Sequence, residues 1–258
     1  MDIVDLREFY SSRLGQTTRR LIAARLRPKL AGTAGATIVG LGYAIPYLED
    51  CAGGAGRRLA LMMARQGVVA WPAEGEVSSA LVDEFDLPLL ESVADVVLVT
   101  HGLELTEGPE EMLAEIWRVL APQGRLLLVV PNRRGLWARF DSSPFGQGQP
   151  YSRPQLARLL RDARFAISSW SQVLYLPPLH WSLLHNAAGA LEALGSRAMP
   201  GLAGAIIVEA TKQVYAIAPG KRVRRVGSRL KPALTPVTPR LEETSTARNA
   251  LLLPGHTL

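Results

Sequence analysis

Short apolar runs alternate with amphipathic stretches along most of this chain of 258 residues. The runs are rich in valine, isoleucine and leucine, which is typical of strands buried on both faces of a sheet. Between them, apolar residues recur at the spacing of helices that pack on a sheet. We therefore predict strands at 37–39, 58–63, 79–82, 95–100, 124–131, 165–176 and 205–218, and helices within 2–30 and at 46–51, 109–120, 152–164 and 181–194.

The alternation of strands and helices indicates the fold class. Strands separated by helices form a mostly parallel sheet that right-handed crossovers cover on both faces. The last two predicted strands flank a single helix and could form an antiparallel edge. The pattern therefore predicts a doubly wound α/β fold with a seven-stranded, mostly parallel sheet and an antiparallel edge strand.

Composition divides the chain into three parts. We expect a helical cover at 1–35, which Pro28 and the glycines near residue 35 separate from the first strand. A domain at 36–218 follows, and then a tail at 219–258 that is rich in proline, threonine and arginine and is expected to be disordered. The tail holds eight basic and two acidic residues, so 8 − 2 = +6, the whole formal net charge of the chain. The basic excess predicts a solvated tail and leaves contact with RNA or acidic lipid open.

Three further features limit the function classes. Cys51 is the single cysteine, so neither an intrachain disulfide nor a cysteine-based metal site can form. The spacing of His180, His185 and His256 suggests no metal site. The chain shows no signal peptide and no apolar run long enough to span a bilayer. We expect a cytoplasmic protein without a membrane span.

The first strand ends in the run ATIVGLGYAIPYL at 36–48, where small residues make a turn before a helix. Such a turn lets the backbone approach a ligand, and the N–H groups of the following helix attract negative charge. A Gly-x-Gly sequence after a strand is also common in plain turns. A nicotinamide-binding turn fits poorly, because Pro46 stands where the third small residue would lie.

Three segments together resemble the class I S-adenosylmethionine-dependent methyltransferases. They are VGLGYA at 39–44, VDEFDLPL at 82–89, and the stretch from DVVLVTHGLEL to LLLVVPN at 95–132, which contains an HVLEH-like motif. The resemblance covers 36–151 well. It implies a Rossmann-like methyltransferase fold and S-adenosyl-L-methionine as the cofactor.

The resemblance also implies a cofactor site. Asp83 stands where the family's acidic residue accepts a hydrogen bond from the adenine amino group, a role that suits an acceptor-only carboxylate. His101 lies where the sulfonium and the acceptor meet and could act as the catalytic base, or it could fix a neighbouring loop. The full set of implied cofactor-binding residues is Gly40, Leu41, Gly42, Tyr43, Met62, Asp83, Glu84 and His101.

A connection at 132–151 follows the fifth predicted strand and is longer than ordinary loops. Because it leaves the carboxyl end of a parallel strand, we interpret it as a substrate lid. Its arginines and aromatic rings could stack on bases and pair with phosphates, enclose a small aromatic or lipid-like molecule, or close over the core. The candidate substrate residues are Asn132, Arg133, Arg134, Trp137 and Phe145.

The sequence favours a methyltransferase whose acceptor, tRNA or a small molecule, is open. The family's second strand usually ends in an acid that holds the ribose hydroxyls, whereas residues 61–63 here are Leu-Met-Met. Ala44 and Leu105 are milder departures. The alternative is a non-catalytic protein of the same fold that binds a partner. Some relatives act on tRNA with a small zinc-binding activator protein, which the resemblance makes a candidate partner, and RNA is another.

Overall fold

The computed structural model describes residues 1–141, 143–175, 177–178, 188–198 and 201–214. The tail at 219–258, the predicted helical residues 181–187, and His180, His185 and His256 lie outside these ranges. Backbone contacts group Met1–Ala216 into one unit. Its helices are α1 (Ile3–Ser11), α2 (Arg13–Leu30), α3 (Ile45–Cys51), α4 (Pro109–Val119), α5 (Arg153–Asp162) and α7 (Ala188–Ala198), with short 3-10 helices η1 (Trp137–Arg139) and η2 (Pro144–Gly146).

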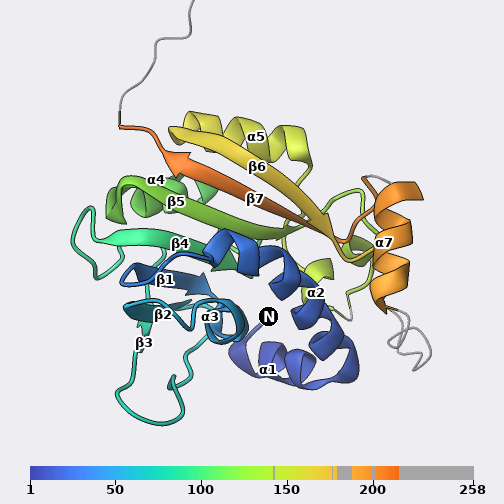
Figure 1. Cartoon of the computed structure of the whole chain (residues 1–258), viewed down its shortest axis with the longest axis horizontal. Helices are drawn as coiled ribbons and strands as arrows, with labels where there is room; N and C mark the ends of the chain where they lie inside the picture. The colour runs from blue at the N-terminus through green and yellow to red at the C-terminus, as the bar shows by residue number, and fades with distance from the viewer. Residues whose placement is uncertain (142, 176, 179–187, 199–200, 215–258) are drawn as a thin grey trace, which may run out of the picture. The chain divides into compact units, whose positions relative to one another are not determined.

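Seven strands form one sheet: β1 (Thr37–Gly42), β2 (Arg57–Met63), β3 (Ser79–Val82), β4 (Ala94–Thr100), β5 (Leu120–Pro131), β6 (Phe165–Val173) and β7 (Ala205–Lys212). Their order is β3-β2-β1-β4-β5-β7-β6, and β7 runs antiparallel to both of its neighbours (Figure 1). The predicted seven-stranded, mostly parallel α/β fold is confirmed. The strand order reverses between β1 and β4, and open sheets of this kind bind ligands outside the carboxyl ends of such strands.

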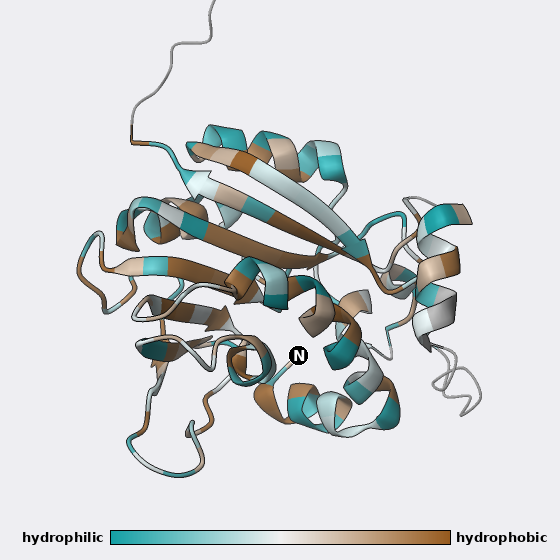
Figure 2. Cartoon of the chain, viewed as in Figure 1, coloured by the Kyte–Doolittle hydropathy of each residue, from teal (hydrophilic) through white to brown (hydrophobic). Residues whose placement is uncertain are grey.

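Two buried clusters cover the two faces of the sheet. On one face α1, α2 and α3 pack through residues such as Leu6, Leu26 and Leu48. On the other face α4 and α5 pack through Leu113 and Leu156. Apolar residues follow the central strands, whereas both helix layers carry polar residues on their outer surfaces (Figure 2). The sheet is thus packed between two apolar helix layers, which fix the positions of the strand ends.

The N-terminal segment forms two helices within the predicted range 2–30, which the apolar pattern alone leaves as one helix or two. Asp2 begins α1 with a capping box, and its side chain accepts from the N–H groups of Val4 and Asp5. Ser12 alone joins α1 to α2 and caps the second helix. The helical range predicted at 2–30 agrees with the structure, because α2 ends at Leu30, with Pro28 in its last turn.

The boundary between α4 and β5 differs from the prediction. The sequence predicts a helix at 109–120 and a strand only from residue 124, with Gln123 and Gly124 as turn residues between them. In the structure α4 ends at Val119 and β5 begins at Leu120, so both residues lie inside β5. The register with β4 shifts between the Ala94–Leu120 pair and the Val96–Arg125 pair. Gln123 has a φ of 65°. An irregularity of this kind bends a strand without ending it, and turn-forming residues alone do not distinguish the two.

Candidate functional site at the reversal of strand order

The glycine turn at the end of β1 is locked to the end of β4. The N–H of Tyr43 donates to the carbonyl of Thr100 at 2.8 Å, and the Thr100 hydroxyl donates back to the Tyr43 carbonyl at 2.7 Å. Gly42 has a φ of +79°, and a Cβ there would lie 2.4 Å from the Thr100 carbonyl oxygen. A Cβ at Gly40 would lie 2.6 Å from the Cβ of Ala44. The chain's own close packing therefore requires both glycines.

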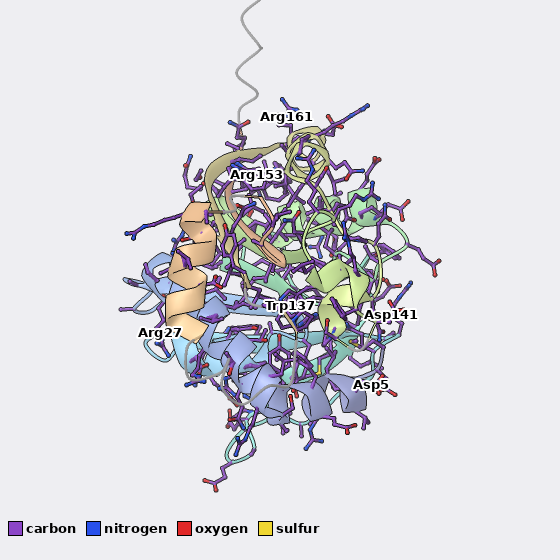
Figure 3. The ribbon with its side chains drawn as sticks, turned by 90° about the vertical axis from the view of Figure 1, so that its right-hand side faces the viewer. Asp5, Arg27, Trp137, Asp141, Arg153 and Arg161 are labelled. Carbon is purple, nitrogen blue, oxygen red and sulfur yellow. The ribbon has the colours of Figure 1, made fainter. Side chains whose placement is uncertain are left out.

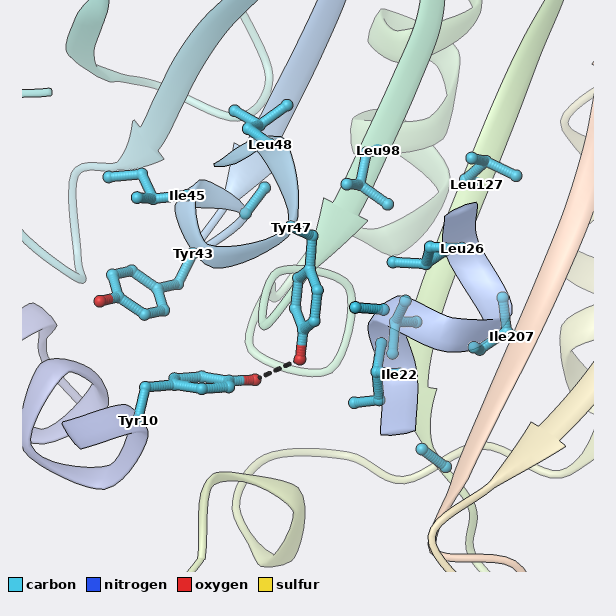
Figure 4. Close-up of a cluster of buried hydrophobic side chains, with 14 of the residues drawn as sticks. Tyr10, Ile22, Leu26, Tyr43, Ile45, Tyr47, Leu48, Leu98, Leu127 and Ile207 are labelled. Carbon is cyan, nitrogen blue, oxygen red and sulfur yellow. Dashed lines mark hydrogen bonds between the residues drawn. The ribbon is translucent and has the colours of Figure 1, made fainter. Parts of the chain in front are cut away.

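His101 follows β4 directly and faces the N-terminal helix. Its backbone has a left-handed φ of 51°, which turns the chain sharply at the end of the strand. The side chain is buried, and its Nε2 lies 2.8 Å from the hydroxyl of Tyr10 in α1. The same hydroxyl lies 2.9 Å from that of Tyr47 in α3 (Figure 4). Three side chains from distant segments thus form one chain of hydrogen bonds.

A buried carboxylate lies on the other side of the imidazole. Glu104 is 2% exposed, and its Oε1 lies 3.4 Å from Nδ1 of His101. Within the described part of the chain, neither carboxylate oxygen of Glu104 nor Nδ1 of His101 has a hydrogen-bond partner. A carboxylate is acceptor-only, so we assign the ring proton to Nδ1 and the free lone pair to Nε2. Buried polar atoms without partners are rare in folded proteins and mark this point for a function.

The protein's own side chains cover the strand ends. The side-chain amide of Gln66, just after β2, donates to the carbonyl of His101. The N–H of Ile3 at the start of α1 donates to the Gln66 carbonyl at 2.7 Å. Together these contacts draw α1 over the end of β4. In this arrangement, which we call the closed form, α1 and Gln66 cover the strand end beside the glycine turn.

A crevice of about 350 Å³ lies at the outer seam between α1 and η2. Asp5, Glu8 and Phe9 of α1 line one side, and Ser143 and Pro144 line the other. Figure 3 shows Asp5 near the surface at the end of the molecule that carries α1, with Trp137 in the interior. Two carboxylates and the N-terminal residue Met1 line this seam, which leaves an excess of negative charge.

Burial changes the acidity of the tyrosines in this region. It raises the pKa of Tyr10 well above the ordinary value, and the nearby Tyr47 raises it further. Burial also raises the pKa of Tyr47, and that of Tyr151 to about 12. The phenol groups therefore stay protonated at neutral pH, so that Tyr10 can donate to His101.

The two acids after β3 lie in different environments. Asp83 is exposed, and its Oδ1 accepts from the N–H of Phe85 at 2.9 Å, which leaves Oδ2 open to solvent. Glu84 is buried; its carboxylate lies 3.4 Å from Nε of Arg65 and accepts from the Thr106 hydroxyl. Asp83 is thus free to accept from a ligand, whereas Glu84 is committed to the protein.

The remaining implied cofactor residues belong mainly to the core. Leu41 and Met62 are fully buried, on opposite faces of the sheet. The ring of Tyr43 is almost buried and lies 5.6 Å from that of Tyr10. In this closed arrangement Tyr43 packs against α1.

The predicted lid contains both core and surface residues. Trp137 and Phe145 are buried, and the Phe145 ring lies 4.9 Å from that of His101. The Asn132 side-chain amide donates to the carbonyls of Gly201 and Ala203, which ties the loop to the start of β7. Arg133 and Arg134 are exposed. The loop thus encloses the site with its aromatic rings and presents its charges to solvent.

Sequence reasoning did not identify Tyr10, Tyr47 and Gln66 as site residues. Tyr10 and Tyr47 lie on the apolar faces of α1 and α3, where a tyrosine looks like any core ring. Gln66 follows β2 in a short loop and matches no motif. Their roles depend on contacts between segments up to 91 residues apart. Only the burial of a polar group on an apolar face could have marked the tyrosines.

Residues 40–128 match the model of a family described as a methyltransferase domain. In structure, the chain is similar to an S-adenosylmethionine-dependent methyltransferase from Mesorhizobium loti, with a TM-score of 0.53 and 16% identity over 73% of this chain and 96% of that one. Residues 40–128 thus match a methyltransferase domain, and the described chain has the fold of the S-adenosylmethionine-dependent methyltransferases. The comparison with curated proteins finds no match.

Two other solved structures share the methyltransferase fold. One is the complex of the Haloferax volcanii Trm112 methyltransferase activator with a candidate methyltransferase, at a TM-score of 0.55 and 17% identity over 81% of this chain and 98% of that one. The other is the [4+2]-cyclase SpnF, at a TM-score of 0.54 and 21% identity over 78% and 83%. Because one fold supports different reactions, the reaction of this methyltransferase domain must be argued from its site.

The chemical groups at this site are of the types that can bind S-adenosyl-L-methionine. The methyltransferase domain offers a tight glycine turn at the carboxyl end of β1, an exposed Asp83 carboxylate, and unpartnered buried atoms beside β4. Residues 61–63 bring no carboxylate to the end of β2. In the described residues no cluster suits a metal ion, and no helix is both long and apolar enough to cross a membrane.

Proposed function

We propose that this protein is an S-adenosylmethionine-dependent methyltransferase that works when α1 moves away from the strand ends. The observation that carries the proposal is the position of His101 beside the glycine turn, with one nitrogen facing a buried carboxylate. S-adenosyl-L-methionine supplies a methyl group on a sulfonium, whose carbon–sulfur bond breaks with its electrons going to sulfur as the acceptor bonds to the methyl carbon.

The chain's own groups would bind and orient the cofactor. The backbone at Gly40 and Gly42 would lie beneath its amino-acid and ribose parts, and Asp83 would accept from the adenine amino group. Charge-assisted hydrogen bonds of this kind contribute about 1.5–3 kcal/mol each. The carboxylate of Asp83 matters all the more because the end of β2 offers none for the ribose.

His101 would accept the acceptor's proton at Nε2. The Nδ1–H group faces Glu104, and a buried carboxylate stabilises the imidazolium that forms. Burial by Phe145 and Trp137 excludes water from this point, which strengthens electrostatic interactions. A methyltransferase needs such a base only where the acceptor carries a proton, so this arrangement favours hydroxyl or N–H acceptors.

The non-catalytic alternative is less well supported. The argument for it is the absence of an acidic residue at the end of β2. A purely structural role for His101 does not explain why Glu104 is buried without a hydrogen-bond partner. Buried polar groups without hydrogen-bond partners cost stability and persist where a function needs them.

An activator protein remains a proposed partner. The outermost strand β3 pairs on one side only, and the apolar side chains of Val77, Leu81 and Leu90 are exposed at or near it. An unpaired strand edge with apolar side chains is a surface that a partner can cover. Co-expression with a small zinc-binding activator should raise the soluble yield, and an unchanged yield would remove the partner from the proposal.

The function is tested by methyl transfer from labelled S-adenosyl-L-methionine to RNA, protein and metabolite pools. The decisive variant is His101→Asn, because asparagine also tolerates the left-handed backbone but provides no base. We expect it to lower kcat by about 100-fold or more. Cofactor affinity should stay the same or rise by up to about fivefold, because the hydrogen bond from Tyr10 is lost as well. Failure of all three pools to accept label, with cofactor bound, would contradict the proposal.

A further inference from the structure

The hydroxyl of Tyr10 lies at the atom to which the acceptor would present its proton. Nε2 of His101 carries the free lone pair, and Tyr10 approaches it at 2.8 Å. A tyrosine side chain is a phenol. The closed structure thus already contains an aromatic hydroxyl bound at the proposed base.

The surroundings of the Tyr10 ring form an aromatic slot. Its centroid lies 5.6 Å from that of Tyr43, 6.1 Å from that of Tyr47 and 5.8 Å from that of His101. Edge and tilted contacts of this kind favour a flat ring. The slot has one polar end, where His101 and the Tyr47 hydroxyl meet the hydroxyl of Tyr10.

The group that fills the slot belongs to a separable segment. α1 is nine residues long and continues into α2 only through Ser12. Its buried side chains are Leu6 and Tyr10, and its start is held by the Ile3–Gln66 backbone bond. The crevice of about 350 Å³ at its outer seam shows where a ligand could enter as α1 moves.

Charge at this seam disfavours an anionic ligand. Among the described residues that line the crevice, Asp5 and Glu8 bring two carboxylates and Met1 brings one α-amino group, so negative charge is in excess. Glu104 adds a buried carboxylate on the inner side. A phosphate backbone would meet negative charge at both points, whereas a neutral phenol would not.

We propose that the acceptor is a neutral aromatic hydroxyl compound, which binds at His101 in place of the Tyr10 side chain. The inference rests on the proposed function and names its substrate class. In the closed form Tyr10 is an internal competitor. An acceptor must therefore displace α1, and its apparent affinity is reduced by the closed fraction of the protein.

The test uses p-cresol, which is the tyrosine side chain itself, and toluene, which lacks only the hydroxyl. The full chain carrying 3-fluorotyrosine is followed by fluorine NMR, with the Tyr10 resonance assigned from Tyr10→Phe. We expect p-cresol to shift that resonance and toluene to shift it less. Calorimetry should show p-cresol binding to Tyr10→Ala about tenfold more tightly than to the wild type, and about fivefold more tightly than toluene binds.

Tyr175→Ala removes a ring away from this site and should bind p-cresol as the wild type does. If Tyr10→Ala does not fold, Tyr10→Phe keeps the ring and should still strengthen p-cresol binding severalfold. Equal binding of p-cresol and toluene, or an RNA oligonucleotide that shifts the Tyr10 resonance while p-cresol does not, would overturn the proposal. These measurements need no cofactor. A separate titration with S-adenosyl-L-methionine therefore shows whether a negative result concerns only the phenol acceptor or the proposed methyltransferase function as well.

Discussion

Glu104 and His101 face each other at 3.4 Å between Oε1 and Nδ1, in a place that solvent does not reach. They are three residues apart, and the left-handed turn at His101 brings them together. Neither atom has a hydrogen-bond partner among the described residues. The pair therefore costs stability in the closed form, which is typical of groups retained for chemistry.

Replacing the carboxylate should separate stability from activity. We expect Glu104→Gln to leave the free energy of unfolding unchanged or to raise it by about 1 kcal/mol, because a buried charge is removed. Methyl transfer should fall about tenfold or more, since the imidazolium loses its partner. Urea denaturation and the labelled-cofactor assay measure the two effects.

Glu115 is the matched control, because it is also buried but fully partnered. It accepts from the Leu87 N–H at 2.8 Å and from Arg118. Glu115→Gln should lower the free energy of unfolding by about 1–3 kcal/mol and leave transfer unchanged. The reverse pattern in the two variants would assign Glu104 a structural role.

Loosening α1 should strengthen cofactor binding. Tyr10→Phe deletes the hydroxyl that bridges His101 and Tyr47, which costs the closed form about 1 kcal/mol. If α1 and the cofactor compete for the strand ends, the affinity of Tyr10→Phe for the cofactor should be up to about fivefold higher than that of the wild type. Tyr175→Phe removes the hydroxyl that donates to Gln172 and should not change cofactor affinity. Equal titration curves for the two variants would mean that α1 does not compete.

The buried tyrosines predict a loss of stability at alkaline pH. Burial raises the pKa of Tyr10 in the folded state above its ordinary value of 10.0, with Tyr47, Tyr43 and Glu104 adding to the shift. The stabilisation is complete below pH 10, and it is lost as the pH rises above that value, because the unfolded chain releases the proton first. Denaturant titrations across this range, with tyrosinate absorbance as the probe, should show a smaller loss in Tyr10→Phe. A loss of the same size in that variant would exclude Tyr10 as a source.

The division of the chain can be tested by truncation. Residues 219–258 carry the whole net charge of the protein and were predicted to lie outside the folded domain. Removing them should change the melting temperature by less than about 2 °C. A fall of several degrees in a calorimetric scan would show that the segment stabilises the domain.

The sheet was predictable because each strand is an apolar run whose burial is visible locally. The 79–82 strand and the start of α5 at its Ser152 capping box agree with the pattern. Turn-forming residues gave a wrong boundary where pairing with another strand determines the structure. Gln123 was predicted to lie before the strand but lies within β5. The end of the N-terminal helical range at Leu30 agrees with the prediction.

The site was only partly predictable. The motifs located Gly42, Asp83 and His101, since those residue types follow particular strand ends. They could not reveal that Tyr10, 91 residues before His101, closes over it. Nor could they separate Asp83 from Glu84, because exposure and pairing with Arg65 distinguish the two acids. Long-range contacts between polar groups leave no periodic signal in a sequence.

The central claim is that the glycine turn and Asp83 bind S-adenosyl-L-methionine once α1 moves. Isothermal titration of the cofactor into the full chain tests it most directly, with Asp83→Asn and its exposed neighbour Asp86→Asn as a matched pair. The account predicts binding to the wild type, binding about tenfold weaker to Asp83→Asn, and unchanged binding to Asp86→Asn. Absence of heat with the wild type and with Tyr10→Phe at high cofactor concentration would contradict it.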